Sequence, residues 1–150
     1  MIRYFTRALR LAPKLPWYAV KWWKFLNAWD RRDYSVMAGC MEALHAAQLS
    51  TSSSHLYLGL CYTHLGQFAD AIREFDLARK PSDSLEAIIF CNTYGYALYR
   101  CGLVEEAREH VKKHSRQSWP ESDREWVAAF LRSTETITQP PVPRRPKLLH

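Results

Sequence analysis

The hydrophobic and polar positions along most of the chain follow a helical rhythm. In "HLYLGLCYTHLGQFADAIREF" (55–75), apolar residues recur every three or four positions, and small residues stand among them at Gly59, Gly66 and Ala71. A glycine inside a helix costs roughly 1 kcal/mol relative to alanine, so the missing bulk must serve a purpose. We predict two antiparallel helices that touch at Gly59 and Ala71, with Gly66 in a left-handed turn between them.

The same small residues recur 36 positions later, at Gly95, Gly102 and Ala107. A fainter copy lies 34 positions earlier, over residues 24–44, where Arg32 stands at the position of Gly66. The third copy is more polar in its later half, since Arg108 stands where the middle copy has Ile72. Internal repetition at this spacing is typical of helical repeat proteins.

Capping residues predict where the helices of the two clearer copies begin and end. Ser54 is predicted to cap a helix over 55–65, and a second helix is predicted over 68–79, where Pro81 stops it. The third copy predicts a helix from a capping box at Asp83 to about Arg100, and another over 103–114.

A final helix is predicted after Pro120, with a capping box at Ser122 and Glu125. Its apolar face would consist of Trp126, Val127, Phe130 and Leu131. No segment of residues 1–135 has the alternation typical of a strand, so the predicted fold class is all-α.

These patterns predict three segments. A basic amphipathic helix is expected over 1–16, a helical array over 17–135, and a disordered, proline-rich basic tail over 136–150. The expected parts of the array are a faint repeat over 18–50, a clear repeat over 52–85, a third repeat over 88–116 and a capping helix over 120–134.

The middle copy resembles the signature of tetratricopeptide (TPR) repeat proteins, with Leu58, Gly59, Tyr62, Gly66, Ala71, Phe75, Ala78 and Pro81. The third copy matches it with Tyr94, Gly95, Leu98, Gly102, Ala107 and Val111. The resemblance implies an array of antiparallel helix hairpins without catalytic chemistry or a cofactor. It also implies a concave groove that binds a peptide or helix of another protein, which suits an adaptor or assembly factor. RNA-binding helical repeats have a similar period and are a less favoured alternative, since the basic charge here lies at the two ends.

By register with that family, the first helix of each repeat would line the groove. The residues at these positions are Trp22, Leu26, Trp29, Leu56, Leu60, Thr63, His64, Asn92, Tyr96, Tyr99 and Arg100. This largely apolar and aromatic set suits an amphipathic helix of the partner better than a charged chain terminus. The alternative for Trp22 and Trp29 is burial against the N-terminal helix.

The net charge of +6 is concentrated at the two ends of the chain. The first 29 residues contain no acidic side chain, and Arg3, Arg7, Arg10 and Lys14 form one basic stripe. Such a stripe beside apolar residues suits an anionic membrane surface, which makes a peripheral membrane tether the alternative function. Two other interpretations are a cap on the first repeat and a mitochondrial transit peptide. No run of 18 apolar residues is present, so we expect a cytoplasmic protein without a spanning helix.

Candidate chemistry is sparse, and the sequence predicts neither an enzyme nor a metal site. His110 and His114 have a spacing that can bind metal, but the neighbouring lysines favour a solvated helix face. The cysteines (Cys40, Cys61, Cys91 and Cys101) match no zinc pattern and are predicted to be buried apolar residues. Cys61, which lies near His64 in the sequence, is likewise predicted to be a buried thiol rather than part of a reactive Cys–His pair. The sequence predicts no particular oligomeric state.

Overall fold

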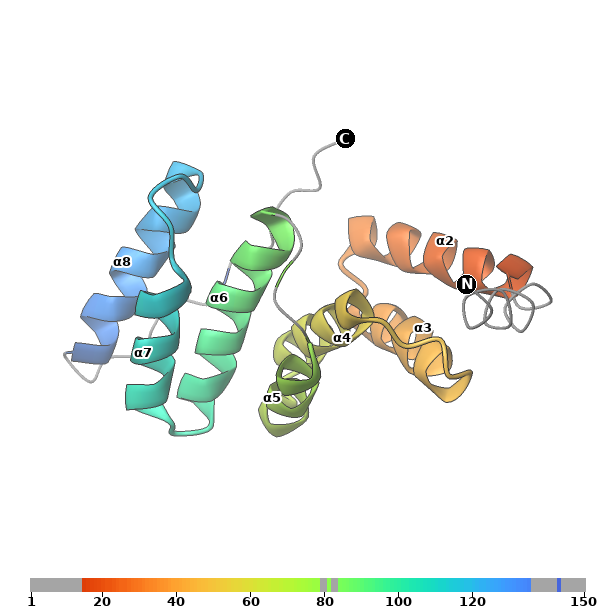
Figure 1. Ribbon diagram of the computed structural model, residues 1–150, viewed down its shortest axis with the longest axis horizontal. Coiled ribbons are helices and arrows are strands. Elements are labelled where there is room, and N and C mark those ends of the chain that lie inside the picture. The colour runs from red at the N-terminus through yellow and green to blue at the C-terminus, as the bar shows by residue number, and fades with distance from the viewer. Residues whose placement is uncertain (1–14, 79–80, 82–83, 136–142, 144–150) are drawn as a thin grey trace, which may run out of the picture. The chain divides into compact units, whose positions relative to one another are not determined.

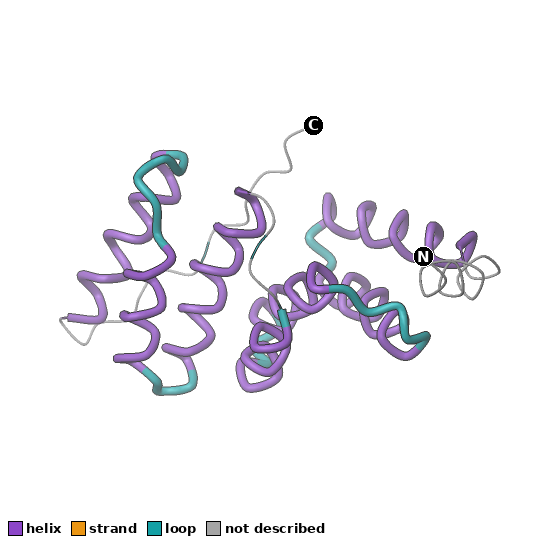
Figure 2. Tube along the Cα trace, in the orientation of Figure 1, coloured by secondary structure: helices purple, strands orange, loops and turns teal. Residues whose placement is uncertain are grey.

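The structure, a computed structural model, describes residues 15–78, 81, 84–135 and 143. This part of the chain contains seven helices and no strand (Figures 1 and 2), which confirms the all-α fold class. Internal contacts divide the chain into an N-terminal unit ending at Ser50 and a C-terminal unit beginning at Thr51. The basic stripe of residues 3–14 and, apart from Pro143, the tail of residues 136–150 lie outside the described residues.

The N-terminal unit contains α2 (Leu15–Arg31) and α3 (Tyr34–Ala46), which pack against each other. Pro16 stands in the first turn of α2, where a helix needs no backbone N–H donor. Asp33 caps α3, since its side chain accepts a hydrogen bond from the Val36 N–H at 3.1 Å. The large residues buried in this unit are Phe25, Trp29, Met37, Met41 and Leu44.

The C-terminal unit contains α4 (Ser52–His64), α5 (Phe68–Leu77), α6 (Ser84–Arg100), α7 (Val104–His114) and α8 (Glu121–Glu135). In this unit α6 packs against α4, α5 and α7, and α8 packs against α6 and α7 (Figure 1). The helix bounds lie close to the predicted ones.

Two capping predictions are wrong, and a third lies outside the described residues. Thr51, not Ser54, is the N-cap of α4, and Ser54 completes the capping box from inside the helix. Ser122 lies within α8, which begins at Glu121, because the helix starts directly after Pro120. The Asp83 cap falls on a residue that the structure does not describe.

One turn geometry closes the first helix of each helix pair, α2–α3, α4–α5 and α6–α7. The left-handed residue of these turns is Arg32 (φ 58°), Gly66 (78°) or Gly102 (83°), and Gln48 (58°) ends α3 in the same way. At each turn the next residue donates its N–H to a carbonyl five positions earlier, closing the helix in the manner of a Schellman motif. These bonds are Asp33 to Ala28 (2.9 Å), Gln67 to Tyr62 (2.8 Å) and Leu103 to Leu98 (3.0 Å). The faint copy therefore keeps the turn of the other two, although arginine stands at its left-handed position.

The small residues inside α4 and α6 lie where the following helix crosses them. A Cβ atom added at Gly59 would lie 3.0 Å from the Phe75 ring of α5. A Cβ atom added at Gly95 would collide with Cγ2 of Val111 in α7. Phe75 and Val111, which are 36 residues apart, thus occupy the space that the glycines leave. Ala71 and Ala107, also 36 residues apart, are both fully buried.

The last helix closes the core of the C-terminal unit. Trp126 and Phe130 of α8 stack with ring centroids 5.0 Å apart, and Tyr99 of α6 meets Phe130 at 6.2 Å. Trp119, in the loop before α8, is buried in the same core. The predicted apolar face of this helix is confirmed, with Leu131 at its partly buried edge.

We predict that Gly59→Leu destabilises the protein strongly, because the new side chain must displace the Phe75 ring from a packed core. Overpacking of this kind costs about 1–3 kcal/mol or more in the free energy of unfolding. Chemical denaturation followed by circular dichroism measures the change.

Gly39 provides the matched control, because it lies in α3, is exposed and has open space around its added Cβ. Gly39→Leu should leave stability unchanged or raise it by up to about 1 kcal/mol, since leucine has the higher helix propensity. Equal stability of the two leucine variants would show that Gly59 does not hold the helix crossing.

Candidate functional site

The groove residues predicted in the N-terminal unit do not share one surface. Trp29 has no exposed area, and Trp22 is partly buried with its ring edge-on to Phe25 at 5.3 Å. Only Leu26, which is 47% exposed, is open to solvent. Trp29 is therefore a core residue of the α2–α3 pair, while the predicted burial against the N-terminal helix concerns residues that lie outside the described part of the chain.

The C-terminal unit buries most of the groove residues predicted there. The buried ones are Leu56, Leu60, Thr63, Asn92 and Tyr96. His64 and Tyr99 are partly buried, and Arg100 is exposed. The expectation that Tyr96 is an exposed anchor is wrong, because α6 packs on α5 and brings the Tyr96 ring edge-on to Phe68 at 6.2 Å.

Asn92, Tyr96 and Arg100 lie one turn apart along the same side of α6. Asn92 is 2% exposed, and neither its amide nitrogen nor its amide oxygen has a hydrogen-bond partner among the described residues. An unsatisfied buried polar group costs about 1–3 kcal/mol. The buried amide of Asn92 therefore adds a polar group to this side of α6 that apolar core packing does not need.

Arg100 is held in position by aromatic side chains at the end of α6. Its guanidinium lies 4.4 Å from the centroid of the Phe68 ring and donates a hydrogen bond to the Tyr96 hydroxyl at 2.9 Å. No carboxylate among the described residues pairs with it. Arg100 is thus an oriented cation that still faces solvent.

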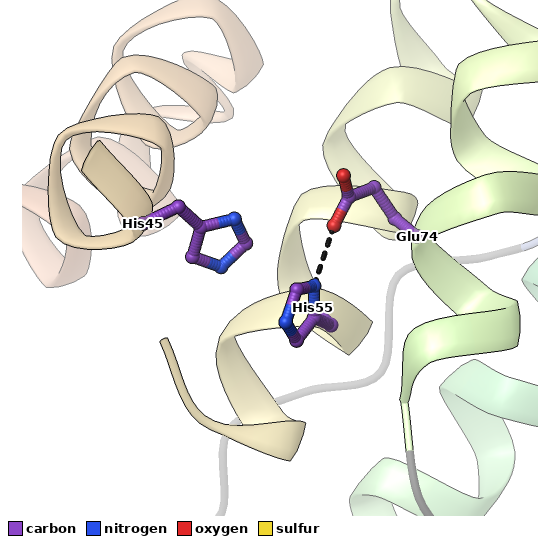
Figure 3. A group of neighbouring side chains, drawn as sticks. All are labelled: His45, His55 and Glu74. Atoms are coloured by element: carbon purple, nitrogen blue, oxygen red, sulfur yellow. Dashed lines mark hydrogen bonds and ion pairs between the residues drawn. The ribbon is translucent and has the colours of Figure 1, made fainter. Parts of the chain in front are cut away.

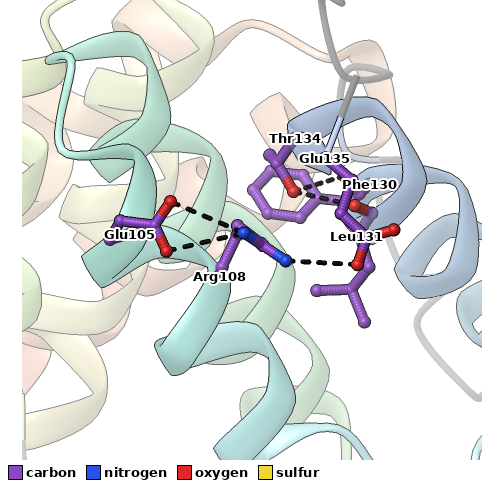
Figure 4. A network of polar contacts seen from close by, with 6 residues as sticks. All are labelled: Glu105, Arg108, Phe130, Leu131, Thr134 and Glu135. Carbon is purple, nitrogen blue, oxygen red and sulfur yellow. Dashed lines mark hydrogen bonds and ion pairs between the residues drawn. The ribbon is translucent and has the colours of Figure 1, made fainter. Parts of the chain in front are cut away.

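Arg100 borders a cleft of about 670 Å³ between the end of α6, the start of α7 and the end of α8. Arg108 lies in its wall between two carboxylates, at 3.5 Å from Glu105 and 3.1 Å from Glu135 (Figure 4). The two carboxylates are well exposed, whereas the Arg108 side chain is 21% exposed. Thr134 also lines the cleft, and its hydroxyl donates to the Phe130 and Leu131 carbonyls of its own helix.

The cleft can bind a carboxylate beside an apolar side chain. Arg108 is already neutralised by two glutamates, so Arg100 is the cation with capacity for a further anion. Tyr99 contributes a partly buried ring to the same cleft. Sequence reasoning assigned Tyr99 and Arg100 to a concave groove rather than to this cleft, and it did not single out Arg108 or Glu135 as site residues, although the replacement of Ile72 by Arg108 between copies was a signal.

A contact between two polar side chains connects the helices of the α4–α5 hairpin. His55 Nδ1 of α4 lies 2.7 Å from Glu74 Oε2 of α5, and each side chain is 19% exposed (Figure 3). His45, drawn in the same figure, belongs to the N-terminal unit.

His110 lies inside the α6–α7 hairpin, so the prediction of a solvated face is wrong for this residue. Its ring sits 4.7 Å from Tyr94 and 5.0 Å from Phe90, and its Nε2 lies 2.9 Å from the Phe90 carbonyl. A carbonyl can only accept, so Nε2 carries the proton. Burial lowers the pKa of His110 to about 4, the hydrogen bond to the Phe90 carbonyl partly opposes this shift, and His114 and Lys113 make smaller lowering contributions. In the described residues no third His, Cys or carboxylate joins His110 and His114 to complete a metal site.

Tyr94 extends this aromatic cluster to α5. Its ring stacks on Phe75 at 5.1 Å, and its hydroxyl donates to Asp76 at 2.5 Å. Burial, followed by this hydrogen bond, raises the pKa of Tyr94 well above its ordinary range. The tyrosine therefore stays protonated and works as a structural donor.

The cysteines are all free thiols, and three of them are buried as predicted. Burial raises the pKa of Cys40, and raises that of Cys91 to about 12, so neither forms a thiolate readily at neutral pH. Cys61 has no exposed area, which agrees with a core thiol. The prediction is wrong for Cys101, which is exposed at the turn after α6.

We predict that acid destabilises the C-terminal unit through His110. A histidine with a folded pKa of about 4 and an ordinary pKa of 6.5 binds more protons when unfolded. Its favourable contribution is complete above about pH 6.5 and is lost as the pH falls toward 4, by up to roughly 3 kcal/mol. His110→Phe should flatten this part of the curve, measured as unfolding free energy against pH. An identical pH dependence in both proteins would contradict the burial of His110.

Among the described helices, none is long and apolar enough to cross a membrane. Comparisons of the chain with protein-family models, with curated proteins and with solved structures found no match. Among the described residues, the cleft bordered by Arg100, which we call the Arg100 cleft, combines an oriented cation with a partly buried tyrosine.

Proposed function

We propose that the chain is a non-catalytic protein-interaction module of the TPR type. The observation that carries the proposal is the repetition of one helix pair in the C-terminal unit. Both α4–α5 and α6–α7 have a helical glycine under a bulky side chain of the second helix, and both turn through a glycine with positive φ. These features support the TPR resemblance of the sequence, and the turn at Arg32 supports a third, diverged copy.

The partner is a peptide or helix of another protein, and the Arg100 cleft is its contact site. Most of the apolar residues expected to line a groove are core residues, so they are not available to a partner. Arg100 and Tyr99 remain, and both border the cleft. Arginine and tyrosine are enriched at interaction hot spots because they combine a large contact area with hydrogen bonding.

The chemistry of the cleft indicates an acidic segment in the partner. An arginine held against aromatic rings loses little side-chain freedom when it binds a carboxylate, so the ion pair is gained at low entropic cost. The neighbouring glutamates, Glu105 and Glu135, disfavour a second acidic residue close to Arg108. We therefore expect one Asp, Glu or chain terminus next to an apolar residue in the bound peptide.

We predict that Arg100→Ala and Tyr99→Ala each weaken peptide binding while the protein stays helical by circular dichroism. Peptides selected by the wild-type protein from a random phage-displayed library serve as ligands, and calorimetry measures their affinity. A loss of about 2 kcal/mol, roughly thirtyfold in Kd, is expected for a hot-spot residue.

Arg124→Ala provides a control of the same chemistry, because Arg124 is exposed on α8 and does not border the cleft. It should bind the selected peptides like the wild-type protein. Equal weakening by Arg124→Ala and Arg100→Ala would exclude the cleft as the contact site, as would selected peptides that bind the Arg100→Ala protein with full affinity.

A further inference from the structure

The outer side of α2 carries an exposed apolar strip that the proposed function does not use. Its members are Trp17 (38% exposed), Val20 (49%), Trp23 (64%) and Leu26 (47%). Successive members are three residues apart, so they wind across the half of α2 that faces away from the buried Phe25 and Trp29, with Trp17 and Leu26 at the two edges of that half. We call this set the α2 apolar strip.

Positive charge accompanies the strip. Lys24 is exposed, and the Lys21 ammonium lies 5.3 Å from the centroid of the Trp17 ring. The chain has no acidic residue before Asp30, and its first 29 residues carry six basic side chains. Within α2 itself, Lys21, Lys24 and Arg31 outnumber the one acidic residue, Asp30, so the helix carries net positive charge. An apolar strip on such a helix favours a partner that combines an apolar interior with negative charge.

We propose that the α2 apolar strip binds the surface of an anionic phospholipid bilayer. The side chains of Trp17 and Trp23 would enter the headgroup region, where indole rings are favoured because one part is apolar and the N–H remains near water. Lys21 and Lys24 have long stems that place their ammonium groups at lipid phosphates. The site is distinct from the Arg100 cleft, since it lies in the other unit.

The shape and composition of the strip favour a bilayer over a protein partner. The strip is one side of a single helix, and a helix is convex, so it offers no cleft for a peptide to enter. Helices that lie in the membrane interface bury an apolar side at the boundary between headgroups and acyl chains, and they keep lysines at the edge of that side. Charge complementarity selects anionic over neutral lipid, because attraction of lysine and arginine to a bilayer depends on its negative surface potential.

Vesicle flotation of the full chain tests the proposal. The wild-type protein should float with vesicles of phosphatidylcholine mixed with phosphatidylserine, and the bound fraction should fall as salt is added. It should remain in solution with vesicles of phosphatidylcholine alone. Binding should also shift the tryptophan fluorescence to shorter wavelength, since Trp17 and Trp23 leave water.

Two variants separate the strip from exposed apolar residues in general. The double variant Trp17→Ser, Trp23→Ser should reduce vesicle partitioning at least about tenfold, since two aromatic anchors are lost from an exposed surface. Leu77→Ser is the matched control, because Leu77 is 60% exposed on α5 in the other unit, and it should float like the wild-type protein. Circular dichroism verifies that each variant is folded.

Several outcomes would overturn the proposal. They are no flotation with anionic vesicles, equal flotation with neutral ones, or flotation that the double tryptophan variant retains. Self-association of the wild-type protein in analytical ultracentrifugation, lost in that variant and without vesicle binding, would assign the strip to a second copy of the chain instead. Arg100→Ala should float normally, so failure here and failure of the peptide site are distinguishable.

Discussion

The contact between a helical glycine and a bulky side chain of the next helix determines how the C-terminal unit is built. Gly59 faces Phe75 and Gly95 faces Val111: a carbon added at Gly95 would collide with Val111, and one added at Gly59 would force the Phe75 ring to give way. Helices normally avoid glycine because it costs roughly 1 kcal/mol relative to alanine. The cost is offset because each facing side chain, fully buried, fills the space and gains close packing.

The position of the candidate site follows from this contact. The packing of α5 against α4 and α6 places the Phe68 ring beneath the Arg100 guanidinium. Tyr96 is buried beside it, and its hydroxyl accepts a hydrogen bond from the same guanidinium. The α8 helix then closes the core through Trp126 and Phe130 and brings Glu135 to Arg108. A surface cation is thereby fixed by core packing rather than by a carboxylate, which leaves it able to bind one from a partner.

Sequence reasoning could predict what depends on local chemistry. The helices, the turns at Gly66 and Gly102, and the small residues at the crossings follow from periodicity and from the conformational freedom of glycine. It could not predict which residues of α6 are covered, because the exposure of Tyr96 and Asn92 depends on how closely α5 approaches. The burial of His110 and the pairing of Arg108 with Glu135 were missed for the same reason, since their partners are distant in the sequence.

The central claim is that the Val111 side chain occupies the space where Gly95 has no side chain. A double-mutant cycle, measured as free energies of unfolding, tests this claim most directly. Gly95→Ala should destabilise the wild-type protein and cost much less in a Val111→Ala background, where the colliding methyl group has been removed. The account predicts a favourable coupling energy of about 1 kcal/mol or more between the two substitutions. Additive effects, within about 0.5 kcal/mol, would contradict the packing of α7 over Gly95.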